Sequence, residues 1–489
     1  MKIGNVIKFI NARASDLDPA LIERNIDSFV IDSREIKAGD LFFALSQPEY
    51  KNNGFNGEFD DATRFVRQAF ESGAASAVVR EDRFAEHRDD LAEFQNRLLF
   101  VDDSIKALQN LARSVYQQWA KPVVAVTGSA GKTTAKELTA HVLSASCFKV
   151  LRNIKNYNNG LGHPLTILNV VRDPNYDAAV LEMGMSTPMN EIRRLCSITP
   201  PDVAVVLNVL PVHVEHLGSI ENVAKAKAEL IEGMKPNGTA VLNADDPRVL
   251  AMASMARGNV ITFGIDSAAD VTASEIIFKR FGETEFMLTT PSGSAPVRFA
   301  LNGRHNLSNA LSAAAVGHIF GMTANDIAAA LGSAAAPQQR GEVLHFAQGF
   351  TVINDSYNSN PDALLSMVHT LIDGSPEARR RIVVAGEMLE LGDEAAAIHH
   401  RAGSDIAALD VHLLIGVRGM AQEMIAAAGS EKGRFAPDSD AAGEMLVPIL
   451  SAGDVVLIKG SRGVRTEKVL DKILAKFELE KGASGTAGN

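Results

Sequence analysis

The feature that most constrains this chain is an apolar, β-branched run that ends in a glycine-rich loop and leads into a helix-forming stretch, at residues 123–143. Strand, loop and helix in this order direct backbone N–H groups and the positive end of the helix toward phosphate oxygens. In such a loop Lys132 reaches the β- and γ-phosphates, and the Thr133 hydroxyl holds Mg²⁺. The pattern therefore predicts a binding site for ATP or GTP.

The loop is shorter than the generic phosphate-binding loop, because only two residues separate its first glycine from Gly131. A short glycine-rich segment before a helix has a simpler interpretation as a plain turn. The sequence Gly-Lys-Thr-Thr after a buried strand favours nucleotide binding instead. The residues predicted to contact the nucleotide here are Gly128, Ser129, Ala130, Gly131, Lys132, Thr133 and Thr134.

Composition and charge narrow the classes of function. The 489 residues suffice for roughly two to four domains, and 46% hydrophobic with 22% charged residues is ordinary for a globular protein. The net charge of −11 disfavours a general nucleic-acid binder. No apolar run approaches the ~20 residues that span a bilayer, and the first residues lack the apolar core of a signal peptide. With only two cysteines, these observations predict a cytoplasmic protein without membrane insertion or a disulfide framework.

Hydrophobic runs divide the chain into segments. Residues 1–104 mix short strands and helices, 105–334 alternate apolar strands with helices, and 335–480 hold a second alternating set. The alternation predicts an α/β fold with mostly parallel sheets, and the small, polar tail at 481–489 is predicted to be disordered. The expected strands are 123–127, 148–151, 178–182, 203–208, 239–242 and 260–263 in the first set, and 351–354, 381–386, 411–415 and 455–459 in the second.

Polar residues follow two of these strands, where ligands of α/β sheets bind. Glu182 ends one strand, and its carboxylate would hold a metal or a water molecule, or is a plain surface charge or helix cap. His213 lies beyond the next strand and is either a ligand or structural. A zinc spacing is not evident around it, and on chemistry alone a histidine is an unusual ligand for Mg²⁺.

Three further segments have both a functional and a structural interpretation. The segment at 156–160 is rich in Asn and is either an ordinary loop or a positioner of substrate. Lys225 and Lys227 lie on a predicted helix, where solvated charges are the usual finding. Asn306 opens an alanine-rich helix and has a simpler role as a cap.

Together these segments resemble the Mur ligases, the ATP-dependent amide-forming enzymes of peptidoglycan precursor synthesis. The loop at 127–134 is similar to the shortened phosphate loop of that family. Within the family, the chain is most similar to the member that adds a D-alanyl-D-alanine dipeptide. The segments that carry this similarity are Asp32-Ser33-Arg34 with 39–45, Asn-Asp-Ser-Tyr-Asn-Ser-Asn-Pro at 354–361, 386–392 followed by His399, and Lys-Gly-Ser-Arg-Gly-Val-Arg at 459–465.

The resemblance implies three domains and a reaction. Residues 1–104 would bind the UDP-MurNAc-peptide, 105–334 would bind ATP, and 335–480 would bring the dipeptide and close over ATP. A carboxylate of UDP-MurNAc-tripeptide would attack the γ-phosphate of ATP, and D-alanyl-D-alanine would then attack the acyl phosphate. The products would be UDP-MurNAc-pentapeptide, ADP and phosphate. A monomeric cytoplasmic enzyme is expected.

The resemblance also assigns roles to single residues. Lys132 and Thr133 would serve the phosphates and one Mg²⁺, and Glu182 and His213 would bind a second Mg²⁺. Lys227, rather than Lys225, would be carbamylated and so become an anion that contributes to metal binding. The other assignments are Asn306 and Asn309 for adenine, Arg340 and Asp355 for the nucleotide, Ser33 and Arg34 for the UDP-substrate, Asn156, Asn158 and Asn159 beside the reacting carboxylate, and Tyr357, Asn358 and Asn360 for the dipeptide.

Two departures from the family and two alternatives accompany this interpretation. Asn-Gly-Glu-Phe at 56–59 stands where many relatives have Asp-Gly-His-Phe, and Arg340 lacks the usual preceding glycine.

Another ligase of the superfamily, such as a folylpolyglutamate synthase, is the nearest alternative function. The segments at 32–34 and 355–361 argue against it. A non-catalytic nucleotide switch is the other, against which the metal-site residues argue. His399 is a candidate base for the incoming amine.

Overall fold

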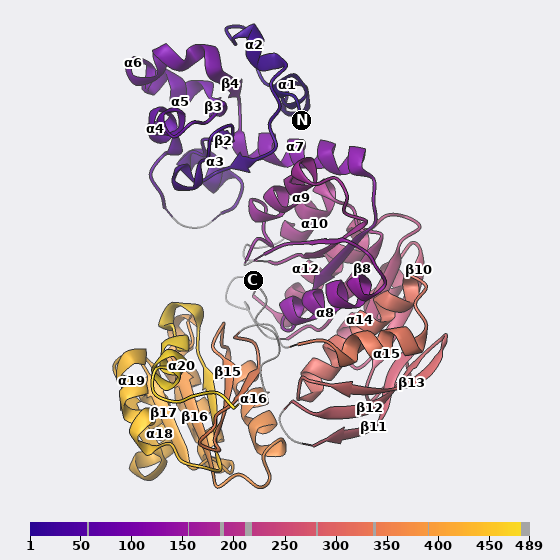
Figure 1. Cartoon of the computed structure of the whole chain (residues 1–489), viewed down its shortest axis with the longest axis vertical. Coiled ribbons are helices and arrows are strands. Elements are labelled where there is room, and N and C mark those ends of the chain that lie inside the picture. Colours follow the sequence, from indigo (N-terminus) through magenta and orange to yellow (C-terminus); the bar gives the residue numbers. More distant parts are fainter. Residues whose placement is uncertain are drawn as a thin grey trace.

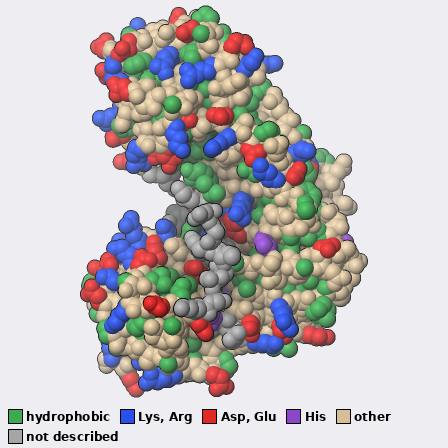
Figure 2. Space-filling model, in the orientation of Figure 1, with side chains coloured by type: hydrophobic (Ala, Val, Ile, Leu, Met, Phe, Trp, Pro, Cys, Tyr) green, Lys and Arg blue, Asp and Glu red, His purple; other side chains and the backbone are tan. Residues whose placement is uncertain are grey.

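The computed structural model contains three β-sheets, each flanked by helices (Figure 1). It describes residues 1–55, 58–154, 156–185, 190–210, 218–279, 282–335, 339–389 and 391–480. The N-terminal part lies at the top of Figure 1, the C-terminal part lies at the lower left, and the central part connects them. Figure 2 shows the molecule hollowed between the N-terminal and C-terminal parts. No helix in the described ranges has the length and apolar character needed to cross a bilayer.

The N-terminal sheet is parallel throughout, in the order β1-β2-β3-β4. Its two middle strands are almost entirely buried, as expected for short apolar strands covered on both faces. The strands are β1 Phe29–Val30, β2 Leu41–Phe43, β3 Ser76–Arg80 and β4 Leu98–Val101, and the helices are α1 Ile3–Ile10, α2 Pro19–Ile22, α3 Gln47–Asn52, α4 Val66–Glu71, α5 Glu81–Glu86 and α6 Arg88–Leu91, with 3₁₀ segments η1 Ser33–Glu35, η2 Ala62–Phe65 and η3 Ala92–Arg97.

Helix α7, Ser104–Trp119, joins the N-terminal part to the central part. It begins at Asp103, whose carboxylate accepts a hydrogen bond from a backbone N–H of the first turn. Its buried Leu111 lies in the same apolar cluster as Ile3 of α1 and Ile167 of the central helix α9. One continuous core therefore holds the N-terminal sheet against the central part.

The central sheet has the strand order β13-β12-β11-β10-β9-β8-β5-β7-β6. The strands from β5 to β11 pair in parallel, which confirms the predicted parallel sheet and places β5 between β7 and β8. All six strands expected here are present. Their bounds are β5 Val123–Thr127, β6 Val150–Arg152, β7 Ala178–Glu182, β8 Val203–Val206, β9 Thr239–Asn243 and β10 Asn259–Gly264.

Three further strands of this sheet were not predicted: β11 Val271–Phe278, β12 Thr284–Thr290 and β13 Gly293–Phe299. Strand β12 pairs antiparallel with both of its neighbours. Its side chains alternate between buried and half-buried, because one face packs on the core and the other lies nearer solvent. A search for continuous apolar runs finds strands that are buried on both faces and misses such alternating strands.

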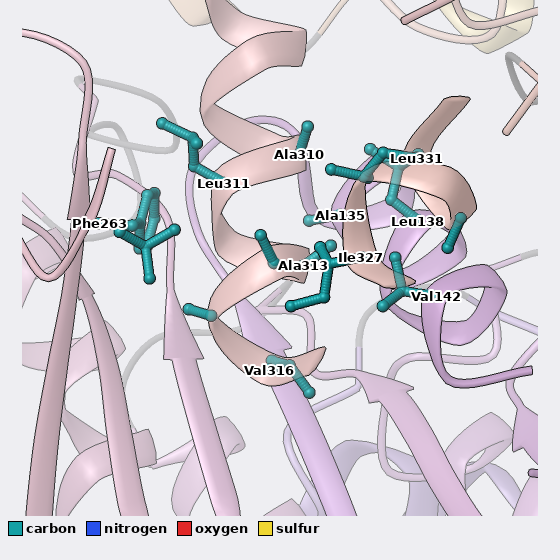
Figure 3. Close-up of a cluster of buried hydrophobic side chains, with 14 of the residues drawn as sticks. Ala135, Leu138, Val142, Phe263, Ala310, Leu311, Ala313, Val316, Ile327 and Leu331 are labelled. Atoms are coloured by element: carbon teal, nitrogen blue, oxygen red, sulfur yellow. The ribbon is translucent and has the colours of Figure 1, made fainter. Parts of the chain in front are cut away.

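Helices α8, α14 and α15 cover one face of this sheet (Figure 3). Ala310 and Ala313 of α14 are small and fully buried, which lets α14 lie close to α8. Burial of larger side chains such as Leu138 contributes roughly 1.5–3 kcal/mol each and fixes the helix that follows the phosphate loop. The central helices are α8 Lys132–Ala145, α9 Gly162–Arg172, α10 Glu191–Ile198, α12 Ile220–Gly233, α13 Pro247–Leu250, α14 Arg304–Ile319 and α15 Ala324–Gly332, with the 3₁₀ segment η4 Ala251–Met255.

The C-terminal sheet has the order β14-β15-β19-β16-β17-β18, and only its edge strand β14 is antiparallel to its neighbour. The strand predicted at 411–415 begins two residues later, because the Val411 N–H takes part in a turn with Leu409. The elements are β14 Glu342–His345, β15 Thr351–Asp355, α16 Pro361–Asp373, β16 Arg380–Gly386, η5 Gly392–Glu394, α17 Ala395–Ala408, β17 Leu413–Val417, α18 Ala421–Lys432, β18 Gly433–Ala436, α19 Ser439–Leu446, η6 Val447–Ile449, β19 Asp454–Lys459, η7 Arg462–Val464 and α20 Glu467–Leu474.

Candidate functional site

The phosphate loop runs from the end of β5 to the start of α8 and is held by the chain that follows β8. The Asn208 side chain accepts a hydrogen bond from the Ala130 N–H at 2.9 Å and donates to the Ala130 carbonyl at 3.2 Å. The Asn208 carbonyl accepts a third bond from the Ser129 N–H at 3.1 Å. Sequence reasoning missed Asn208, although its place directly after an apolar strand was a usable signal. These bonds fix the loop before any phosphate binds.

Gly131 must be a glycine for two reasons. It has a left-handed backbone conformation, with φ of 81°, where L side chains are strained. A Cβ atom at this position would also lie 2.5 Å from Oδ1 of Asn309 on α14. The predicted adenine residue Asn309 therefore packs directly against the loop.

We expect Gly131→Ala to lower the free energy of unfolding by about 1–3 kcal/mol and to weaken ATP binding about tenfold. The added methyl group strains the backbone and pushes Asn309 away from the loop. Chemical unfolding and calorimetric ATP titration measure the two effects. The control is Gly321→Ala, where φ is 84° and no atom lies within 4 Å of the added Cβ. An unchanged ATP affinity in Gly131→Ala would contradict the prediction.

Lys132 is half-buried at the start of α8, and its Nζ donates to the Gly128 carbonyl at 2.8 Å and to the Ser129 carbonyl at 3.3 Å. Burial lowers the pKa of Lys132, the carboxylate of Glu182 opposes that shift, and the positive charge of Arg340 adds to it. Arg340, from the segment that enters the C-terminal part, therefore lies close enough to Lys132 to affect its charge. The loop lysine and a cation of the third segment thus share one electrostatic environment.

Glu182 is buried at the end of β7 and joins two of the predicted residues. Its Oε2 accepts a hydrogen bond from the Thr133 hydroxyl at 2.7 Å, and its Oε1 accepts one from Nδ2 of Asn158 at 2.9 Å. The Asn153 side chain bonds both the N–H and the carbonyl of Glu182, at 3.0 and 2.9 Å. Asn153 was not predicted, although it follows β6 in the same way that Glu182 ends β7. The carboxylate is consequently fixed beside the loop.

Lys227 is buried on α12, whereas Lys225 of the same helix is exposed. The pKa of Lys227 is lowered to about 7, mainly by burial and further by the nearby charge of Lys132, while the charge of Glu229 opposes the shift. The uncharged amine is therefore much more accessible at Lys227 than at an ordinary lysine. The two lysines are two residues apart in the sequence, but their environments in the structure are different.

The predicted metal ligand His213 lies outside the described residues. Within the described residues, no three His, Cys, Asp or Glu side chains are close enough to hold a metal ion. Beside the phosphate loop, the hydroxyl of Thr133 and the carboxylate of Glu182 lie next to each other and offer oxygen atoms to a metal ion. A metal site here would rest on these two oxygens together with ligands of other kinds.

A cavity of roughly 1290 Å³ lies between the phosphate loop and the C-terminal part. The structure brings together residues that were predicted for three different ligands. The predicted residues that line it are Ser129, Lys132 and Asn156 from the central part, and Tyr357, Asn358 and Asn360 from the C-terminal part.

The Tyr357 ring lies near two arginines. Cζ of Arg340 lies 3.9 Å from the centre of the Tyr357 ring, and Cζ of Arg462 lies 5.9 Å from it. Arg462 also donates to the Gln339 side chain at 3.2 Å, and the Tyr357 N–H donates to the Gln339 carbonyl at 3.1 Å. These contacts attach the segment between the two parts to the cavity wall. The sequence analysis had predicted both Tyr357 and Arg340, but not their contact or the part of Arg462.

Asp355 and several predicted asparagines also have structural partners. Asp355 pairs with Nζ of the buried Lys459 at 2.5 Å, and that Nζ also donates to the Asn358 carbonyl at 2.9 Å. Asn360 accepts a hydrogen bond from the Ala363 N–H at the start of α16. Asn159 accepts bonds from the N–H groups of Leu161 and Gly162, and Asn306 donates to the Asn302 carbonyl. Contacts of these residues with ligands stay predictions.

Ser33 and Arg34 lie in η1 of the N-terminal part. The exposed Arg34 guanidinium forms a two-pronged contact with Asp32, with distances of 2.9 and 2.6 Å. Burial raises the pKa of Tyr157, and the negative charges of Glu35 and Asp32 raise it further. Segment η1 therefore lies near enough to Tyr157 of the Asn-rich loop for its charges to act on that side chain. The departure at Asn56-Gly57 lies outside the described residues.

His399 has both ring nitrogens engaged with the backbone. It is fully buried, its Nε2 accepts a hydrogen bond from the Met388 N–H at 2.9 Å, and its Nδ1 donates to the Ala395 carbonyl at 2.7 Å. A ring fixed in this way has no free nitrogen with which to accept a proton from an amine. The candidate role of His399 as a base is therefore wrong, and its role is structural.

We expect His399→Gln to reduce the free energy of unfolding by about 1–3 kcal/mol, because one or both buried hydrogen bonds are lost. The pH dependence of kcat should stay that of the unaltered enzyme. The adjacent, exposed His400→Gln is the matched control. Loss of one limb of the pH–rate profile in His399→Gln alone would restore a catalytic role.

Comparison with known proteins identifies the family. The chain matches the Mur ligase middle domain over residues 126–317 and the Mur ligase, glutamate ligase domain over residues 339–462. The UDP-N-acetylmuramoyl-tripeptide–D-alanyl-D-alanine ligase of Escherichia coli K12 is 35% identical over 91% of this chain and 93% of the relative. A crystal structure of MurF from Acinetobacter baumannii superposes with a TM-score of 0.84 at 28% identity, covering 97% of this chain and 99% of that one.

A second solved structure includes a nucleotide product. The MurF ligase of Thermotoga maritima in complex with ADP superposes with a TM-score of 0.77 at 28% identity, covering 92% of this chain and 97% of that one. Sequence and fold agree along nearly the whole chain. The chain belongs to the Mur ligase family, among its UDP-N-acetylmuramoyl-tripeptide–D-alanyl-D-alanine ligases.

Proposed function

We propose that the chain catalyses the ATP-dependent joining of D-alanyl-D-alanine to UDP-MurNAc-tripeptide, giving UDP-MurNAc-pentapeptide, ADP and phosphate. The observation that carries the proposal is the shared cavity, because Lys132 and Ser129 of the phosphate loop line it together with Asn156 and with Tyr357 of the C-terminal part. A nucleotide, an acceptor peptide and a dipeptide must meet at one place in this reaction. The cavity offers a surface for each.

The reaction proceeds through an acyl phosphate. A carboxylate oxygen of the tripeptide attacks the γ-phosphorus of ATP, and ADP leaves. The uncharged amine of the dipeptide then attacks the acyl carbon, and the tetrahedral intermediate collapses with loss of phosphate and a proton. Because both ATP and the carboxylate are anions, Lys132 and the loop N–H groups serve mainly to offset their repulsion and to align them.

Mg²⁺ fits the oxygen donors of the site. Thr133 and Glu182 place a hydroxyl and a carboxylate oxygen beside the phosphate loop, and oxygen is the ligand atom that Mg²⁺ prefers. We assign these two residues, with His213 and a carbamylated Lys227, to two Mg²⁺ ions. Bound Mg²⁺ supplies further neutralisation of phosphate charge. The protein positions the donors through the bond from Asn158 to Glu182.

Carbamylation would turn Lys227 from a cation into an anion that suits a metal site. An uncharged amine attacks CO₂, the new N–C bond forms, and one proton is lost to leave a carbamate anion. A buried lysine beside another cation is readily uncharged, and the resulting anion would attract Lys132 rather than repel it. Exposed Lys225 has neither property. Lys227 is thus the lysine of α12 suited to join a metal site.

The three parts divide the substrates. We propose residues 1–104 with Ser33 and Arg34 for the UDP-substrate, 105–334 with Asn306 and Asn309 for ATP, and 335–480 for the dipeptide, with Arg340 and Asp355 contacting the nucleotide. Segment η1 lies near Tyr157 of the Asn-rich loop, which suits one substrate spanning the first two parts. A cytoplasmic location and a monomeric state belong to this proposal, and light scattering of the purified protein tests the second.

The decisive experiment measures phosphate release from ATP with UDP-MurNAc-tripeptide, with and without D-alanyl-D-alanine, and identifies the product by mass. Release that requires both substrates and yields the pentapeptide supports the proposal. Pteroylglutamate with glutamate is the parallel assay for the folate-type alternative. ATP binding without any amide product would contradict ligase function and favour the nucleotide switch.

A further inference from the structure

The cavity continues beyond Tyr357 into the C-terminal part, between α16 and α17. Its wall there is apolar and is made by Leu365 of α16, by Leu391, and by Ile398 and Ala402 of α17. Ala402 is buried, and the other three side chains are half-buried. A wall of this kind contacts small aliphatic groups such as methyls and offers them no hydrogen bond.

Among the described residues, three cations line the cavity, and the exposed Arg401 alone has a head group without a protein partner. Lys132 donates to two loop carbonyls. Arg462 bonds the Glu467 carboxylate at 2.9 Å and the Gln339 side chain. Within the described part of the chain, the Arg401 guanidinium makes no hydrogen bond and no ion pair, although it lines the cavity beside the apolar wall. Even Asp405, one turn further along α17, does not pair with it.

We propose that Arg401 binds the terminal carboxylate of the incoming dipeptide, an inference that rests on the proposed ligase function. A guanidinium donates two parallel hydrogen bonds to a carboxylate and cannot lose its proton at ordinary pH. With the carboxylate on Arg401, the two methyl groups lie against Leu365, Leu391 and Ile398. The free amine then points along the cavity toward Ser129 and Lys132, where the acyl phosphate forms. Arg401 is thus a positioning residue that sets the direction of the dipeptide.

Charge around the cavity sharpens this specificity. Asp362, Asp393, Glu394 and Asp405 also line the cavity and carry no ion pair among the described residues. Their negative charges repel any carboxylate that is not held by a cation. A dipeptide with one carboxylate fits beside Arg401, whereas a dipeptide with an acidic second side chain brings a second negative charge that has no partner. The site is therefore selective for incoming dipeptides with small, uncharged side chains.

The test compares Arg401→Met with the unaltered enzyme on two incoming dipeptides, D-alanyl-D-alanine and its C-terminal amide. For the unaltered enzyme, the amide should have a KM about 10–100-fold higher than the acid, with kcat changed little. For Arg401→Met, KM for the acid should rise by the same factor, and the acid and amide should become nearly equal. Arg434→Met is the matched control, because Arg434 of β18 is exposed, donates to the nearby carbonyls of Ser430 and Gly433, and does not line the cavity.

The outcomes separate this inference from the ligase assignment. If the unaltered enzyme forms pentapeptide but Arg401→Met keeps the full preference for the acid over the amide, the role of Arg401 is overturned and the ligase function stands. Equal losses on acid and amide would also overturn it, because they indicate a structural role. Absence of pentapeptide from the unaltered enzyme would instead overturn the ligase function. Thermal unfolding of Arg401→Met should match the control.

Discussion

Replacing Lys132 with methionine is expected to lower kcat for pentapeptide formation by about 10²–10³-fold. Lys132 is the first residue of α8 and lies beside the loop that would hold the transferred phosphate. Its positive charge offsets the repulsion between ATP and the carboxylate of the tripeptide. Methionine keeps the length of the side chain and removes the charge. The substitution weakens stabilisation of the transition state, in which negative charge is spread over the oxygens of the phosphoryl group in transfer.

The fold should survive this change, since Nζ of Lys132 donates only to the carbonyls of Gly128 and Ser129. We expect the free energy of unfolding to stay within about 1 kcal/mol of the original value. Phosphate release and urea unfolding measure the two quantities. The exposed Lys121→Met, just before β5, is the control and should leave both unchanged. A kcat within tenfold of the unaltered enzyme would show that the loop does not act through this lysine.

Replacing Lys227 with alanine is expected to lower kcat by about 10²-fold, because the site loses the anion proposed to bind metal. Lys225→Ala, on the same helix but exposed, should have no effect. Incubation with ¹³C-labelled bicarbonate should give a carbamate carbon signal in the unaltered enzyme and in Lys225→Ala, but not in Lys227→Ala. A carbamate signal that persists in Lys227→Ala would place the modification elsewhere.

The activity of the unaltered enzyme should also depend on pH through Lys227. Its pKa is lowered from 10.5 to about 7, so the reactive, uncharged amine predominates above pH 7 and the ammonium below it. At a fixed concentration of dissolved CO₂, carbamate and kcat should therefore fall together as the pH decreases through about 7. A carbamate signal of constant size between pH 6 and 8 would contradict this assignment.

Much of the central part was predictable because local patterns specify it. Continuous apolar runs predicted β5 and β7 with their observed bounds, and the motif after β5 predicted Lys132 and Thr133. The alternating strands β11 to β13 were missed for lack of such runs. Arg401 was missed because an arginine on a helix resembles a solvated charge, and only the cavity beside it suggests a ligand.

The sequence by itself determined the strand–loop–helix unit, the α/β class and the family, because each rests on residues that are adjacent in the chain. Tertiary structure alone decided which strand ends are neighbours. The order β8-β5-β7 brings Asn208 and Glu182 to the loop from opposite sides. Tertiary packing also buried Lys227 and left Lys225 in solvent. It placed Tyr357 of the C-terminal part and Lys132 of the phosphate loop along the same cavity. Such contacts join segments far apart in sequence, and their burial and charge depend on packing that no local pattern encodes.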